Sequence, residues 1–187
     1  MPCKPSYLCS FVYRTVYQRT VCHRVILCRL ENLPESKMTE FNDEKNMQLS
    51  SGIAAFEAKE FRRAWQMLQP LSDEGVPEAQ YRCGIMLQNG LGVIARPKAA
   101  ADLFLAAAEQ NLGLAQHSAG VMYLFGEGVE QDAEAAIQWL EKAGANGLAG
   151  AWSTLGMMYK EGEVVDKDVE RARECFAKAG FDPDEIG

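Results

Sequence analysis

A period of 36 residues constrains this chain more than any other feature of its sequence. Residues 113–148 align without a gap on residues 77–112, and residues 149–181 continue the same pattern. The positions in register include Ala79/Ala115/Ala151, Gly84/Gly120/Gly156, Gly90/Gly126/Gly162 and Ala100/Ala136/Ala172. Such a period is typical of repeat architectures, in which each unit buries its apolar face against its neighbours.

Each repeat is predicted to form two helices joined by a glycine-containing loop. In the clearest copy, apolar residues at helical spacing predict a first helix over 114–125 and a second over 133–146. Gly126 suits the left-handed position that follows a helix. Asp132 is a natural N-cap for the second helix, because its carboxylate can accept a hydrogen bond from a free backbone N–H.

One glycine recurs inside each predicted first helix, where it costs about 1 kcal/mol relative to alanine. A close approach of the second helix would explain this cost. We expect the glycines to face the recurring small residues of the second helix, with larger side chains filling the neighbouring layer. The expected pairs are Gly84 with Ala100, Gly120 with Ala136, and Gly156 with Ala172.

A shorter unit precedes the three long ones. Gly52 and Ala64 are 12 residues apart, whereas the matching glycine and alanine of the long units are 16 apart. This unit is therefore predicted to be the same hairpin with a loop four residues shorter. The predicted organisation is a basic extension at 1–37, a short first repeat at 46–76, repeats at 77–112, 113–148 and 149–181, and a tail at 182–187. The fold class is all-α, a right-handed α-solenoid of stacked helix-turn-helix repeats with about eight helices.

The long units resemble the Sel-1-like repeat family, and the short unit resembles the related tetratricopeptide repeat. The resemblance covers about residues 46–180. It rests on the combination of Ala115, Gly120, Tyr123, Gly126, Gly128, Val129, Asp132, Ala136, Trp139 and Ala143. Leu87 in place of the tyrosine and Val164 in place of the second loop glycine depart from the family pattern. We expect these departures to loosen single loops without changing the fold.

The first 37 residues differ from the rest in charge and pattern. They hold six Lys or Arg and two Glu, a net charge of +4 in a chain of net charge −7, which leaves −11 for the remainder. Arginines recur every five residues from Arg14 to Arg29, which fits neither a helical face nor a strand face. We expect an unfolded upstream extension, with Met38 as a candidate start.

Six cysteines are present, and none forms a Cys-x-x-Cys pair. Cys83 and Cys175 align with apolar residues of the other copies and are expected to be small core side chains. Free thiols suit a reducing compartment, so the expected localisation is cytoplasmic. The alternatives are mitochondrial, since residues 1–30 are rich in arginine and free of acidic residues, or periplasmic.

No motif with catalytic, cofactor-binding or metal-binding spacing is visible. The Gly126-Glu127-Gly128 loop follows a predicted helix rather than a strand, which makes it a helix cap and not a phosphate loop. His117 has no partner at a fixed spacing, and the acidic loop residues are expected to be solvated rather than held in a dry pocket. The acidic body argues against nucleic-acid binding. A membrane span is not expected, because no apolar run is long enough.

The resemblance implies a non-catalytic protein–protein interaction module, a scaffold or adaptor that binds a peptide or helix of a partner in a concave groove lined by the first helices. The groove positions implied by similarity to tetratricopeptide repeats are Tyr81, Ile85, Gln88, Asn89, His117, Val121, Leu124, Phe125, Ser153, Met157, Lys160 and Glu161. Leu124 and Phe125 stand where the flanking copies have polar residues, which predicts a solvent-facing apolar anchor. The alternative is that one of the two packs under the loop.

Two other functions are open at the level of sequence. Cysteine-rich members of the Sel-1-like family are associated with binding or hydrolysis of penicillin-type ligands, which implies a small-ligand hydrolase as the alternative activity. Their serine chemistry usually uses Ser-x-x-Lys, and this sequence has no such motif. Self-association through exposed solenoid ends is the other possibility.

Overall fold

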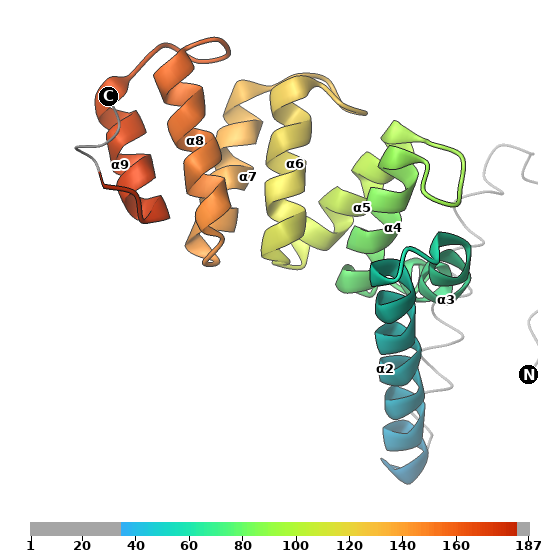
Figure 1. Ribbon diagram of the computed structural model, residues 1–187. Coiled ribbons are helices and arrows are strands. Elements are labelled where there is room, and N and C mark those ends of the chain that lie inside the picture. Colours follow the sequence, from blue (N-terminus) through green and yellow to red (C-terminus); the bar gives the residue numbers. More distant parts are fainter. Residues whose placement is uncertain (1–34, 183–187) are drawn as a thin grey trace, which may run out of the picture. The chain divides into compact units, whose positions relative to one another are not determined.

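The structure, a computed structural model, describes residues 35–182. These residues form eight helices and no strand (Figure 1). The helices are α2 (Glu35–Glu57), α3 (Phe61–Asp73), α4 (Pro77–Asn89), α5 (Pro97–Glu109), α6 (Gly113–Phe125), α7 (Ala133–Ala145), α8 (Ala149–Glu161) and α9 (Val169–Ala179). The chain divides into two compact units, Met1–Lys45 and Asn46–Gly187, and the repeats lie in the second.

The N-terminal prediction is only partly covered by the structure. Residues 1–34, most of the predicted extension, lie outside the described residues, as does the tail from residue 183. Residues 35–37 were expected to be unfolded, but they are the first residues of α2. The pattern of the first repeat begins only at residue 46, so it did not predict the earlier part of this helix.

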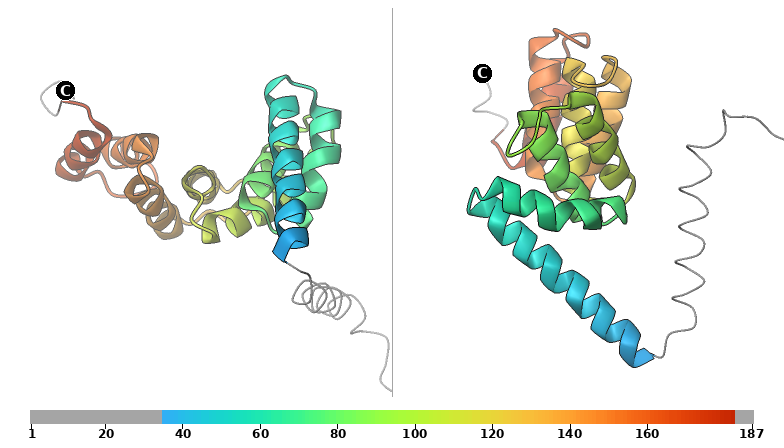
Figure 2. Two further views of the ribbon diagram at one scale, coloured as in Figure 1. Left: turned by 90° about the horizontal axis from the view of Figure 1, so that it is seen from below. Right: turned by 90° about the vertical axis from the view of Figure 1, so that its right-hand side faces the viewer.

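Within the second unit, successive helices pair in chain order and form the predicted helical solenoid. Helices α4/α5, α6/α7 and α8/α9 form the tightest pairs, and α3/α4, α5/α6 and α7/α8 join one hairpin to the next. The order from α4 to α9 is seen in Figure 1, and the view from below in Figure 2 looks nearly along the axes of α6–α9. Each hairpin therefore buries its faces against its sequence neighbours, as a repeat array requires.

The loops confirm the predicted capping. Gly90, Gly126 and Gly162 follow α4, α6 and α8 in the left-handed conformation, with φ of 68°, 72° and 73°. A glycine suits this position because it lacks the Cβ that strains other residues there. The loop between α2 and α3 covers residues 58–60, whereas the loop between α6 and α7 covers residues 126–132. The first hairpin is thus shortened by the four residues expected from the spacing.

Asp132 caps α7, and this contact gives a direct test of the loop structure. Its Oδ1 accepts a hydrogen bond of 3.0 Å from the backbone N–H of Ala135. Replacing Asp132 with alanine is expected to lower the free energy of unfolding by about 1 kcal/mol, because that N–H loses its side-chain acceptor. Urea unfolding followed by circular dichroism measures the loss. Asp132→Asn keeps an acceptor and should stay near wild type; an equal loss in both variants would contradict the capping role.

The glycines inside the first helices are explained by close packing, but their partners differ from the expected alanines. A Cβ added to Gly84 would lie 2.8 Å from the Phe104 ring, and one added to Gly156 would lie 2.9 Å from the Phe176 ring. These aromatic residues stand one helical turn after the alanines. Gly120 is intermediate, since its nearest contacts are Leu140 and then the Ala136 carbonyl oxygen. The recurring glycine therefore receives the large side chain of the second helix.

Partly buried polar contacts join the two helices of a hairpin. Gln80 Oε1 accepts a hydrogen bond of 3.0 Å from Gln110 Nε2, and 36 residues later Gln116 Oε1 accepts one of 2.7 Å from Asn146 Nδ2. Gln116 is only 1% exposed, so this bond satisfies a group that would be costly to bury alone. In the last copy Trp152 takes this position and lies against Gly144, where the preceding copy has alanine.

The core contains the methionines that recur every 36 residues, and it confirms the expected role of the two described cysteines. Met86, Met122 and Met158 are all buried. Cys83 and Cys175 are free thiols inside the core. Burial raises the pKa of Cys83 to about 12, so this thiol stays protonated and unreactive at neutral pH.

Candidate functional site

The predicted groove positions all lie on the first helices of the three long repeats, α4, α6 and α8. Exposure divides them into three groups. The half-buried residues are Tyr81, Ile85, Gln88, His117, Val121 and Ser153; the exposed ones are Asn89, Phe125, Met157, Lys160 and Glu161; and Leu124 is buried. The predicted groove positions therefore do not form a uniform solvent-facing surface. Their exposed apolar side chains, Phe125 and Met157, lie on α6 and α8.

The residues of α4 are largely engaged in packing and local bonds. The Tyr81 ring lies 5.8 Å from the Phe104 ring, and burial raises the pKa of the Tyr81 hydroxyl. Gln88 Nε2 donates a hydrogen bond of 2.8 Å to Glu127, just beyond the end of α6. Asn89 donates to the carbonyl of Ile85 in its own helix. At this end of the predicted groove, the side chains of Tyr81, Gln88 and Asn89 already make contacts within the protein.

His117 links α6 to α8. Its Nε2 lies 3.2 Å from Thr154 Oγ1, and burial lowers the pKa of His117, which leaves the imidazole neutral at pH 7. The Thr154 hydroxyl donates its proton to the Gly150 carbonyl at 3.0 Å. A hydroxyl has one proton, so His117 must donate to Thr154. The pair is therefore a structural bridge in which the imidazole is not placed to activate the hydroxyl as a base.

The expectation that Leu124 and Phe125 stand side by side in solvent is wrong for Leu124. Its side chain is 6% exposed and belongs to the core cluster built from α6–α9. Phe125 is 66% exposed, as predicted. The alternative, in which one of the two packs inward, describes the structure. Position 124 is turned toward the following hairpin, so a leucine there is covered by α8 and its loop.

These two residues border a small apolar cavity, called here the Leu124 cavity, of about 270 Å³. It lies between the C-terminal ends of α6 and α8, which point to the same end of the array in Figure 1. The lining residues are Leu124, Phe125, Thr154, Met157, Met158, Glu161, Glu163 and Val164. Four of the predicted groove positions, Leu124, Phe125, Met157 and Glu161, are thus brought together at one site.

The loop between α8 and α9, which borders the cavity, has Val164 where the family pattern has a glycine. Gly92 and Gly128 occupy the equivalent loop position, and each lies against the start of the second helix of the preceding hairpin. A Cβ added to Gly128 would lie 2.5 Å from the Pro97 carbonyl oxygen. Val164 carries a Cβ and cannot repeat this approach. Its half-buried side chain packs instead on the core cluster of α6–α9 that contains Leu124, and it forms one wall of the cavity.

Sequence reasoning missed Thr154, Met158, Glu163 and Val164 as lining residues. The similarity to tetratricopeptide grooves considers helix positions alone, and two of these residues lie in a loop. The signal that was available is the apolar residue at 164, where both preceding copies have glycine.

The rim of the cavity carries unpaired negative charge. Glu161 at the end of α8 and Glu163 in the loop are both exposed. Neither forms an ion pair within the part of the chain that the structure describes. Among the described residues, the cavity lining contains no Lys or Arg. The site therefore combines an apolar interior with an acidic edge.

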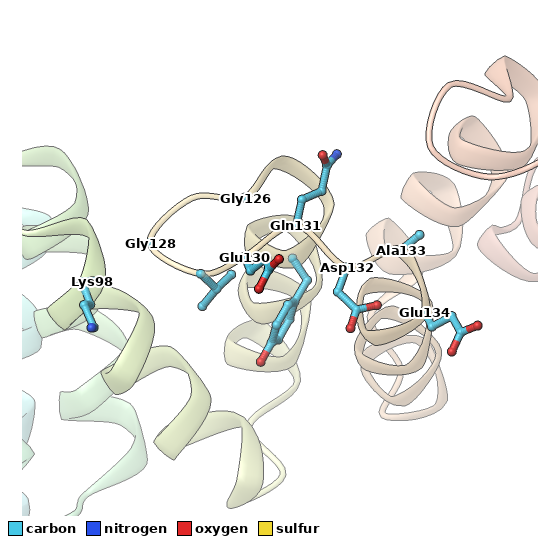
Figure 3. Close-up of a pocket in the computed structure, with 10 residues that line it drawn as sticks. Lys98, Gly126, Gly128, Glu130, Gln131, Asp132, Ala133 and Glu134 are labelled. Atoms are coloured by element: carbon cyan, nitrogen blue, oxygen red, sulfur yellow. The ribbon is translucent and has the colours of Figure 1, made fainter.

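A second, open concavity lies beside the loop of residues 126–132, where the glycine pattern might be taken for a phosphate site. Lys98, Tyr123 and the acidic residues Glu130, Asp132 and Glu134 are among its lining residues. Figure 3 shows that the side chains do not converge: Gln131 projects away from the loop, and Asp132 and Glu134 lie at the start of α7. Such dispersed, solvated carboxylates do not form a catalytic pair.

The described residues give no metal site and no membrane-spanning element. No group of three or more His, Cys, Asp or Glu in residues 35–182 is arranged to hold a metal ion. None of the helices in the same range combines the length and apolar content needed to cross a membrane.

Comparison with known proteins identifies the repeat. The family model for the Sel1 repeat matches residues 77–112, 113–148 and 155–180. A crystal structure of a Sel1 repeat protein from Oxalobacter formigenes is similar, with 28% sequence identity and a TM-score of 0.64 over 71% of this chain and 53% of that one. No curated protein matches the sequence.

A protective antigen of uropathogenic Escherichia coli strains, whose structure displays an SLR fold, is also similar. It shares 28% identity and a TM-score of 0.68 over 80% of this chain. The chain spans about half the length of the first of these structures and one third of the second, since the matches cover 53% and 33% of them.

Proposed function

The chain belongs to the Sel1 repeat family, and on that premise we propose that it is a non-catalytic protein–protein interaction module, which binds a peptide or helix of a partner along its first helices. The observation that carries this proposal is the pair of exposed apolar side chains on α6 and α8. Phe125 is 66% exposed and Met157 is 47% exposed, and both border the Leu124 cavity. An exposed aromatic residue beside an apolar cavity is the usual composition of an interface anchor.

The catalytic alternative, a small-ligand hydrolase, lacks a supporting observation. Such an enzyme needs a nucleophile activated by a neighbouring base. The hydroxyl that faces the Leu124 cavity is that of Thr154, and its proton is committed to the Gly150 carbonyl. His117 acts as its donor partner, which is the opposite of the polarity that a general base requires.

The proposed setting is the cytoplasm, in line with the free buried thiols of Cys83 and Cys175. Self-association through the solenoid ends stays a prediction. The exposed side chains of α9 are mainly charged, including Glu170, Arg173 and Glu174.

Replacing Phe125 with alanine is expected to weaken partner binding by about tenfold or more, which corresponds to 1.4 kcal/mol or more of lost contact. The measurement is affinity capture with the tagged full-length chain, with each recovered protein quantified by mass spectrometry against wild type. The variant should fold normally, because the ring is mostly in solvent.

Ile94→Ala is the matched control, since Ile94 is 78% exposed but does not line the Leu124 cavity. Partners that are lost with Phe125→Ala and retained with Ile94→Ala support the proposal. Equal recovery of every protein by wild type and Phe125→Ala would remove Phe125 from the binding surface.

A further inference from the structure

The size and lining of the Leu124 cavity indicate what it can hold. Its volume of about 270 Å³ is below the roughly 300–1,000 Å³ of pockets that enclose whole small-molecule ligands. The space suits a single large apolar side chain. Met157 and Met158 line it, and methionine side chains adapt their shape to such an occupant.

The polar groups inside the cavity offer little to a polar occupant. Thr154 is the sole uncharged polar side chain among the described lining residues. Its proton goes to Gly150, and its oxygen already receives the His117 N–H. Away from the rim glutamates, a polar occupant would find only the second lone pair of the Thr154 oxygen, so most of its hydrogen-bonding capacity would go unsatisfied at a cost in binding free energy. The interior therefore favours an apolar side chain.

The negative charges of Glu161 and Glu163 at the edge of the cavity determine which residues can flank the bound apolar side chain. Glu161 and Glu163 stand on the rim without ion-pair partners in the described residues. Lys167 belongs to the same loop, and its Cβ packs near Gly162, but it is not among the lining residues. A bound segment with acidic flanks would meet two carboxylates, whereas Lys or Arg flanks would pair with them.

Building on the proposed interaction function, we propose that the Leu124 cavity binds a basic segment of a partner protein. One large apolar side chain of that segment enters the cavity between Phe125 and Met157. Lys or Arg residues next to it pair with Glu161 and Glu163. The net charge of −11 on residues 38–187 adds a long-range attraction for such a segment.

The test is a selection of random short peptides, displayed on phage, against the full-length protein. Peptides that are enriched are synthesised, and their affinities are measured by fluorescence polarisation against wild type and two double variants. Phe125→Ser with Met157→Ser removes the apolar walls, and Glu161→Lys with Glu163→Lys reverses the rim charge. Ile94→Ser and Glu109→Lys are matched controls, because both residues are exposed and neither lines the cavity.

The enriched peptides are expected to carry an apolar residue flanked by Lys or Arg. Their affinity should fall about tenfold or more in each double variant and stay unchanged in the controls. The charge-reversed variant should in turn prefer the same peptides with glutamate in place of Lys and Arg, because the sign of the rim has changed.

Three results would overturn the inference, and they are distinguishable. Acidic or uncharged peptides, or peptides insensitive to both double variants, would refute the basic-segment site while leaving the interaction function intact. Failure to enrich any peptide would contradict the proposed function itself. A peptide of residues 11–30 of this chain is included, and if it outcompeted all selected peptides, the occupant would be the basic segment of this protein and not a partner.

Discussion

Replacing Phe104 with alanine is expected to lower the free energy of unfolding by about 3–5 kcal/mol, the range found for buried aromatic residues. Phe104 is 1% exposed and belongs to the core cluster of the α4/α5 hairpin. Its ring fills the space left by the missing Cβ of Gly84 and packs on the Tyr81 ring. Alanine would leave a void lined by a glycine, which has no side chain to close it.

Phe125→Ala is the matched control for this prediction, because it deletes the same atoms from a side chain that is 66% exposed. Its effect on unfolding should be within about 0.5 kcal/mol, as for ordinary surface substitutions. Both variants are compared with wild type by urea unfolding followed by circular dichroism. A loss of less than about 1 kcal/mol for Phe104→Ala would mean that the hairpin closes around the deletion, contrary to the close packing seen at Gly84.

The repeat pattern predicted the helices well because each helix end has a local chemical cause. The left-handed glycine at Gly126 and the carboxylate cap at Asp132 act within one turn of their own helix, so both can be recognised without knowing the neighbours. The loop that is four residues shorter in the first hairpin follows directly from the Gly52–Ala64 spacing. Periodicity also indicated the solenoid, since a unit of two helices cannot bury its own apolar face.

The pairing between helices was harder to predict, because it depends on the direction of side chains as well as on their spacing. The alanines were expected to face the glycines, yet Phe104 and Phe176 do so, one helical turn further along. A helical side chain leans toward the N-terminus of its helix. A residue later in the helix can therefore cover the position that spacing alone assigns to the alanine.

At the candidate site, too, the sequence did not predict which side chains contact each other. Sequence comparison of the copies identified position 124 as apolar where its equivalents are polar, but it could not decide which neighbour would cover the side chain. The answer depends on the loop around Val164, which lies in the next repeat and has valine where the preceding loops have glycine. Val164 packs on the same core cluster as Leu124, a contact that can be recognised only once α8 and its loop are placed against α6.

Replacing Gly120 with valine is expected to lower the free energy of unfolding by about 2–3 kcal/mol, toward the upper end of the usual cost of overpacking. A Cβ at this position would lie 2.6 Å from Leu140 Cγ and 3.2 Å from the Ala136 carbonyl oxygen. The leucine cannot turn aside, since it is fully buried. The carbonyl belongs to the α7 backbone and can move only with the whole helix.

The same substitution at Gly150 of α8 separates packing from helix propensity. Nothing lies within 4 Å of a Cβ added there. Because valine is a somewhat better helix former than glycine, Gly150→Val should be neutral or slightly stabilising. The double variant Gly120→Val with Leu140→Ala should lose less than the two single losses combined, since the alanine removes the clash that the valine creates. Additive losses in urea unfolding, or a Gly120→Val variant as stable as Gly150→Val, would contradict a hairpin in which the glycine of α6 exists to receive the leucine of α7.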